Sequence, residues 1–179
     1  EISNEPDSKL SSREEFVEGK RKERETYFFS RNPQLVREGS KVFGSQCIVV
    51  SIDVKHNGDF YEVFTHSGKK ATGINIIDHM KTMQNNGAGE FLINSIDHDG
   101  HMEGFNMDLF ETIKEVVNLP IIAAGGASCL EDFISIAKED HISAVAAGSI
   151  YHYTKITPNM VKGCLNKEGI PVRLCSDSD

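Results

Sequence analysis

The sequence lacks the features of membrane-spanning, secreted, zinc-binding and nucleic-acid-binding proteins. No apolar run approaches the roughly 18 residues that a membrane span requires, and the polar, acidic start predicts no signal peptide. The four cysteines are scattered and form no CxxC pair, which argues against structural zinc and favours a reducing compartment. A formal net charge of −8 argues against a nucleic-acid-binding surface. We therefore expect a cytoplasmic protein that binds neither membrane nor nucleic acid.

Composition divides the 179 residues into two unequal parts. Residues 1–31 are polar and charged, and Ser12–Glu15 resembles a capping box that could begin a solvated helix. From Asn32 onward, apolar runs alternate with amphipathic segments. We expect an atypical helical segment at 1–31, followed by one domain at 32–179.

Four short apolar runs in the second part predict strands, and the segments between them predict helices. The strands are expected at 47–53, 91–97, 120–124 and 144–147, and the helices at 33–43, 72–87, 106–117, 128–137 and 158–169. Strands that alternate with helices predict parallel βα units and an α/β fold. The fold class is thus a (β/α)8 TIM-barrel type, of which four units form a half-barrel.

The first run is continuously apolar and stops on Asp53. This pattern predicts a strand that is buried on both faces, with Cys47 as a small core residue and Asp53 at its carboxyl end. Active sites of (β/α) barrels are built at that end. A carboxylate in a partly closed pocket can act as a general acid or base, so Asp53 is the candidate catalytic residue.

Two glycine turns follow the third and fourth strands. Gly125-Gly126-Ala127 precedes a helix, and Gly148-Ser149 repeats the arrangement one unit later. Backbone N–H groups in such turns can approach an anion closely, and (β/α) barrels bind phosphate at the loops after their last two strands. The glycines could instead serve only tight turns, but two such turns in adjacent units favour a phosphate site.

Other polar residues near strand ends have simpler explanations. Asp97 and Asp99 suit turn chemistry, and Asp99-Gly100 fits it well. His98 and His101 flank that turn and share no helix face, so we expect no metal site and no cofactor. Glu90 begins a strand at the opposite end of the sheet, where a charge usually serves stability.

Seven segments occur in one specific order along residues 32–174. They are Phe43–Gln46 with the strand to Asp53, Thr65–Lys70, Gly87–Glu90, Ser95–Gly100, Pro120–Ala127, Ala147–Ser149 and Gly169–Leu174. Together they resemble the cyclase subunit of imidazole glycerol phosphate synthase, an enzyme of histidine biosynthesis. The resemblance corresponds to the second half of that family's barrel.

The resemblance implies a reaction and roles for single residues. The family takes ammonia from a glutaminase partner and cyclises a substrate with two phosphates, which gives imidazole glycerol phosphate and an aminoimidazole carboxamide ribonucleotide. Asp53 matches one of two acid/base aspartates, and Glu90 matches an acidic residue of the ammonia gate. The predicted phosphate and substrate site comprises Ser95, Asp99, Gly100, Gly125, Gly126, Gly148 and Ser149.

The family's first half-barrel has no recognisable counterpart in this sequence. Residues 1–31 show neither the family's other catalytic aspartate nor its other phosphate site. We therefore expect a fragment, a truncated product or a rearranged half-barrel that cannot run the full reaction alone. Open sheet edges invite pairing, so we also expect a homodimer that completes a barrel.

Three alternatives remain open at this stage. His101 and Asn106 stand where the family usually has a small hydroxyl residue and an aspartate, which leaves room for a paralogue that aminates a sugar nucleotide for surface polysaccharides. A related phosphoribosyl isomerase shares the barrel, but Ser67–Lys70 and Asp97–Gly100 favour the cyclase. From another class, a catalytically silent, phosphate-binding half-barrel would also fit.

Overall fold

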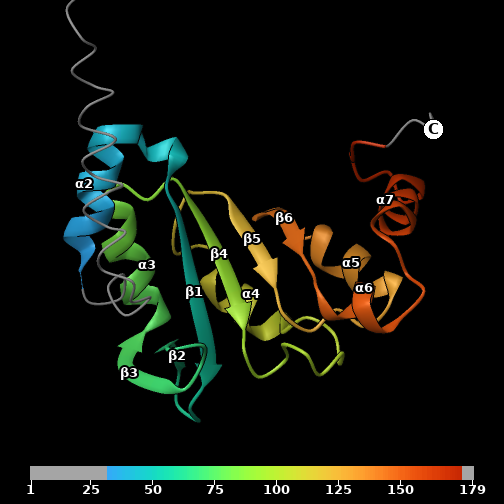
Figure 1. Cartoon of the computed structure of the whole chain (residues 1–179), viewed down its shortest axis with the longest axis horizontal. Coiled ribbons are helices and arrows are strands. Elements are labelled where there is room, and N and C mark those ends of the chain that lie inside the picture. Colours follow the sequence, from blue (N-terminus) through green and yellow to red (C-terminus); the bar gives the residue numbers. More distant parts are fainter. Residues whose placement is uncertain (1–31, 175–179) are drawn as a thin grey trace, which may run out of the picture.

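The computed structural model describes residues 32–174, which are built around one six-stranded sheet (Figure 1). The order is β3-β2-β1-β4-β5-β6, with bounds β1 Val49–His56, β2 Tyr61–Thr65, β3 Lys70–Asn75, β4 Glu90–Ser95, β5 Ile121–Ala124 and β6 Ile142–Ala146. Strands β1, β4, β5 and β6 are parallel, whereas β2 and β3 add an antiparallel hairpin. The parallel part confirms the α/β class and a partial (β/α) barrel. The helix expected within residues 1–31 lies outside the described residues.

Helices connect the parallel strands and cover one face of the sheet (Figure 1). They are α2 Pro33–Phe43, the short 3-10 helix η2 Ser45–Cys47, α3 Ile76–Asn85, α4 Met107–Ile113, α5 Leu130–Ala137, α6 Ser149–Tyr153 and α7 Pro158–Lys167. The start of α7 agrees with the prediction, because the Thr157 side chain accepts the Met160 N–H at 3.3 Å. Helix α6 was not predicted. Among the described residues, no helix is long and apolar enough to cross a membrane.

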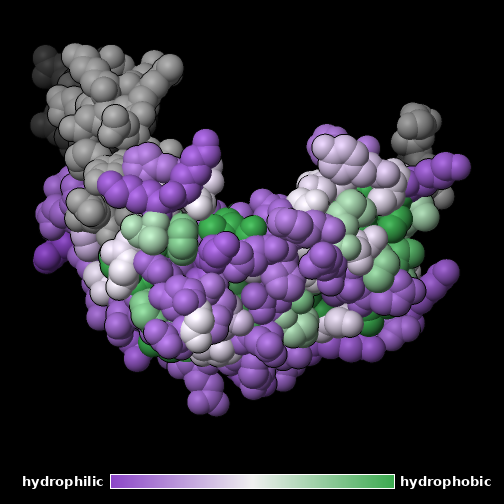
Figure 2. All heavy atoms as spheres, turned by 90° about the horizontal axis from the view of Figure 1, so that it is seen from below, coloured by the Kyte–Doolittle hydropathy of each residue, from purple (hydrophilic) through white to green (hydrophobic). Residues whose placement is uncertain are grey.

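The two faces of β1 differ in burial. Val50, Ile52 and Val54 are at most 2% exposed, whereas Val49 is 49% exposed and Asp53 is half-buried. The prediction of a strand buried on both faces is therefore wrong, because helices cover only one face. Seen from the ends of the strands, the described residues form a crescent with a hollow on one side (Figure 2).

Asp53 does not end its strand as predicted. β1 continues to His56 because its second half pairs with the antiparallel strand β2, with Asp53 opposite Phe64. Asp53 therefore lies in the middle of a strand that is hydrogen-bonded on both sides, opposite Asn94 of β4 as well. Its backbone position is fixed by two neighbouring strands rather than by a loop.

The hairpin changes the predicted start of α3. The helix was expected to begin at residue 72, but Thr72 lies in β3 and donates its hydroxyl to the Val63 carbonyl at 2.6 Å. Asn75 is the actual cap, and its side-chain oxygen accepts the Ile77 N–H at 2.9 Å. Met80, in the middle of α3, is fully buried.

Two further local predictions need correction. Cys47 is exposed in η2 rather than buried in a strand, because β1 begins only at Val49. Helix α5 was expected to begin at residue 128, but it begins at Leu130, with Cys129 as its N-cap and Asp132 completing the capping box. The Asp132 carboxylate accepts the N–H groups of Ser128 and Cys129 at 2.8 and 3.1 Å.

The hydrophobic core lies between the sheet and its helices. Its fully buried large side chains come from both layers: Ile52, Phe91, Ile93 and Ile121 from the strands, and Ile76, Met80, Met83, Leu109, Phe110, Ile113, Phe133 and Ile136 from the helices or their termini. The core holds the strands in register, and thereby positions the loops that follow them.

Candidate functional site

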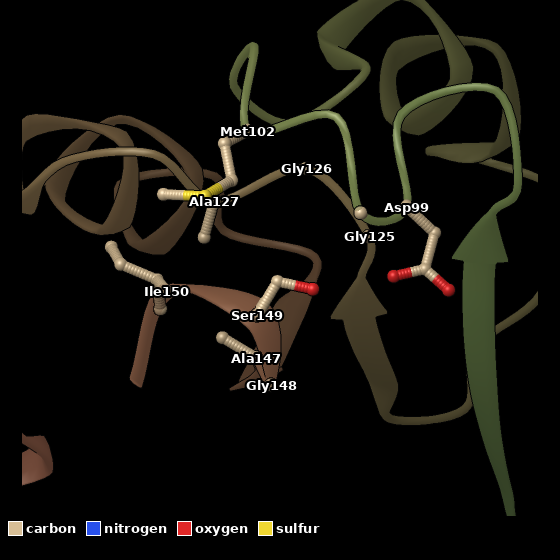
Figure 3. A pocket seen from close by; sticks show the side chains of 10 residues that line it. Asp99, Met102, Gly125, Gly126, Ala127, Ala147, Gly148, Ser149 and Ile150 are labelled. Atoms are coloured by element: carbon tan, nitrogen blue, oxygen red, sulfur yellow. The ribbon is translucent and has the colours of Figure 1, made fainter. Parts of the chain in front are cut away.

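The loops after β4, β5 and β6 meet around one small pocket (Figure 3). Its lining is Asp99, Gly100, Met102, Gly125, Gly126, Ala127, Ala147, Gly148, Ser149 and Ile150. Six of the seven residues predicted to bind phosphate or substrate are in this set, although they come from loops up to 50 positions apart in the sequence. The fold thus brings together two glycine turns that the sequence analysis treated separately.

The turn after β5 requires glycine for both conformation and space. Gly125 and Gly126 have φ angles of +90° and +110°, which side chains rarely tolerate. A Cβ on Gly126 would overlap the Gly104 carbonyl, and the Gly104 N–H donates to the Gly126 carbonyl at 2.9 Å. The same turn is therefore locked to the loop after β4, which forms the opposite wall of the pocket.

The side chains of Ser149 and Met102 give the pocket a polar wall and an apolar wall. The Ser149 hydroxyl points toward the Gly125 turn, so it can donate to an anion held there (Figure 3). The Met102 side chain reaches across toward Ala127 and closes the apolar side (Figure 3). Met102 has φ +55°, and nothing in the sequence indicated its place in this wall.

Asp53 lies outside this pocket but is linked to it through Asn94. The Asn94 side-chain nitrogen donates to Asp53 Oδ1 at 3.2 Å and approaches Asp99 Oδ2 at 3.5 Å. Asp53 also lines a wider cavity of ≈ 220 Å³ beside the β2–β3 hairpin, with Ser51 and Thr65 among its walls. Sequence reasoning missed Asn94, although a polar residue inside an apolar strand was a usable signal.

Ser95 is the one predicted site residue on the opposite face of its strand. It is 1% exposed, and its hydroxyl accepts the Asn106 side-chain N–H at 3.3 Å. The Asn106 oxygen in turn accepts the Tyr61 hydroxyl at 3.2 Å and the Leu109 N–H at 3.1 Å. Burial raises the pKa of Tyr61, so it remains a neutral donor at pH 7. This network joins the hairpin to the start of α4.

Asp97 does not line the pocket but joins two segments of the chain. Its Oδ1 pairs with Lys55 Nζ at 2.9 Å, and its Oδ2 accepts the His56 N–H at 3.3 Å, so it ties the end of β1 to the loop after β4. His98 braces the same loop, because its ring nitrogen donates to the Gly104 carbonyl at 2.9 Å.

Glu90 lies at the opposite end of the sheet, where β4 begins, in register with Val49. It is half-buried and does not line the pocket formed by the loops after β4, β5 and β6. In the part of the chain that the structure describes, no three His, Cys, Asp or Glu side chains form a group that could hold a metal ion.

Comparisons with a family model and with known proteins indicate the same family. A family model described as "Histidine biosynthesis protein" matches residues 27–157. Imidazole glycerol phosphate synthase subunit HisF of Natranaerobius thermophilus is 42% identical over 144 residues, and the subunit of the same name from Thermococcus onnurineus is 48% identical over 143 residues. Each match covers 80% of this chain but only 57% and 56% of the relative, so the chain spans little more than half their length. The chain therefore belongs to the histidine biosynthesis protein family.

Proposed function

We propose that this chain acts in the cyclase component of imidazole glycerol phosphate synthase and contributes one of its two half-barrels. Its substrate would carry two phosphates, one of which occupies the pocket formed by Gly126, Gly148 and Ser149. Ammonia would come from a glutaminase partner. As a single half-barrel, the chain would need a complementary half for turnover.

The observation that supports this proposal best is the convergence of three loops on one pocket. Residues chosen from the sequence as phosphate ligands line it together, and Asp53 is connected to it by one intervening side chain. A phosphate bound among the backbone N–H groups of Gly126 and the Ser149 hydroxyl would hold one end of the substrate. Asp53 would then exchange a proton with the reacting end.

Glu90 marks the face at which we propose that ammonia enters. It lies at the amino end of the parallel strands, whereas the pocket lies beyond their carboxyl ends. A glutaminase that docks at the Glu90 end would deliver ammonia along the sheet toward Asp53. This arrangement separates the ammonia source from the phosphate site by the length of the strands.

Self-association is a further part of the proposal. Among the described strands, β6 pairs only with β5, so its other edge is available for pairing. A groove of ≈ 490 Å³ next to this edge is lined by apolar side chains that include Val145, Val161 and Leu165. Sedimentation at micromolar concentration should show a dimer, and a monomer across that range would contradict this part.

Calorimetric titration with imidazole glycerol phosphate tests the substrate site. The unmodified chain should bind the product, and Gly126→Ala should abolish binding because its new Cβ overlaps the Gly104 carbonyl. Ser149→Ala should weaken binding by about tenfold, the effect of one hydrogen bond to a charged group.

Ser135→Ala is the matched control, because Ser135 is exposed on α5 and lines neither the pocket nor the groove beside β6. Its affinity should equal that of the unmodified chain. A folded chain that binds inorganic phosphate, but shows no turnover with any added first half-barrel, would favour a silent phosphate-binding module. A folded chain that binds neither phosphate nor the product would contradict the proposed site.

A further inference from the structure

Asn94 lies between the acid/base candidate Asp53 and the proposed phosphate pocket. Strand register puts it opposite Asp53 of β1 on one side and opposite Ala124 of β5 on the other. Neighbouring strands lie about 4.8 Å apart, so a short side chain can bridge to the next strand. Asn94 is therefore within reach of the loops after both β4 and β5.

Its contacts extend in three directions. The side-chain nitrogen donates to Asp53 Oδ1 at 3.2 Å and lies 3.5 Å from Asp99 Oδ2, at the limit of a hydrogen bond. The side-chain oxygen lies 2.8 Å from the point that a Cβ on Gly125 would occupy. One amide thus contacts the candidate acid/base group and the loop after β4, and it lies beside the glycine turn.

An amide suits this place on electrostatic grounds. Its nitrogen carries two N–H donors and no charge, so it can serve two carboxylates together. A carboxylate at this position would stand within about 4 Å of Asp53 and Asp99, where like charges repel. A side chain without donors would leave Asp53 free to turn between its staggered rotamers on a half-exposed strand face.

We propose that Asn94 is a positioning residue that holds Asp53 Oδ1, so that Oδ2 is the oxygen that exchanges a proton with the substrate. One proton passes between Oδ2 and the substrate, while Oδ1 keeps its hydrogen bond to Asn94. This inference rests on the proposed function. Beyond that function, it specifies that Oδ2 of Asp53 reacts and that Asn94 orients the carboxylate.

The test compares Asn94→Leu, which keeps the branching at Cγ and removes the donors, with Asn94→Ser, which keeps a short donor. Asn118→Leu is the control, because that asparagine is exposed and remote from the pocket lining. Three quantities are measured: the ¹⁵N–¹³Cγ coupling of Asp53, which reports its χ1 rotamer; the Kd for inorganic phosphate; and kcat and KM of the chain mixed with a first half-barrel of the family.

In Asn94→Leu, the Asp53 coupling should become a rotamer average and kcat should fall about 10²-fold, whereas KM and the phosphate Kd stay within about twofold. Asn94→Ser should recover part of kcat. A single Asp53 rotamer in Asn94→Leu, or a change in KM and phosphate Kd at constant kcat, would overturn the inference. If the unmodified mixture shows no turnover, the proposed function fails, but the coupling still decides whether Asn94 orients Asp53.

Discussion

The two faces of the parallel sheet are made from the same strands but have opposite roles. On the helix-covered face, residues such as Ile52, Phe91 and Ile121 are at most 1% exposed and form the core. On the other face, Val49 is half-exposed, and the polar pair Asp53 and Asn94 lies farther along. Because strand side chains alternate, each strand contributes to both roles through neighbouring residues. Under the proposed function, neighbouring residues of one strand would thereby serve stability and chemistry separately.

The largest expected effect is on the covered face. Phe91→Ala should lower the free energy of unfolding by about 3–5 kcal/mol, because the fully buried ring leaves a cavity. Urea unfolding measures the loss. Where the variant is folded, its phosphate affinity should be unchanged, since the ring does not line the pocket. A loss below 1 kcal/mol would show that the two faces are less distinct than the structure indicates.

A titratable side chain in the covered layer makes stability depend on pH. His79 is 5% exposed in α3, and burial lowers its pKa from 6.5 to about 4. The unfolded chain therefore binds a proton more readily, and stability falls as the pH drops from 6.5 toward 4. The loss should reach about 3 kcal/mol near pH 4.

Urea midpoints between pH 7.5 and 4.5 measure this dependence. His79→Met should remove this component of the slope, whereas His152→Gln should leave it, because His152 is exposed. An unchanged slope in His79→Met would assign the acid sensitivity to other groups.

Asp132 connects the two faces, because α5 packs in the covered layer and begins just after the Gly125-Gly126 turn. Burial by itself would raise the pKa of Asp132, but hydrogen bonds from Ser128 and Cys129 outweigh it and lower the pKa. Asp132→Ala should cost about 1–2 kcal/mol, as for loss of a helix cap. It should also weaken phosphate binding through the adjacent turn.

The capping contribution of Asp132 has a defined pH window. Because its folded-state pKa is lowered, it stabilises the fold above the unfolded-state value and is lost as the pH falls through the folded-state value. Glu131→Ala is the control, since Glu131 is exposed on the same turn. Equal losses in both variants would contradict the assigned role of Asp132.

The smallest effect is expected at Val49 on the uncovered face. Val49→Ser should change the free energy of unfolding by no more than about 0.5 kcal/mol, because half of the side chain is already in contact with solvent. The same urea titration compares it directly with Phe91→Ala. A loss of several kcal/mol in a dimer would instead indicate that this face is buried between copies.

Much of the fold followed from local pattern. The alternation of apolar runs and helices predicted the four parallel strands, and α4 begins after Asn106 as expected, since N-caps depend on a few neighbouring residues. The glycine turns were also recognised locally. The hairpin was harder to predict: Glu62–Thr65 suggest a short extended stretch in the sequence, but the residues of β3 have no clear strand periodicity.

The sequence by itself thus determined the α/β class, the pocket's glycines and the candidate aspartate. Only the tertiary structure decided how these parts meet. β1 extends past Asp53 because β2 pairs with it, and Asn94 contacts Asp53 across 41 positions because β1 and β4 lie in that register. Pairing register depends on the packing of the whole covered face, so no local pattern could specify this contact.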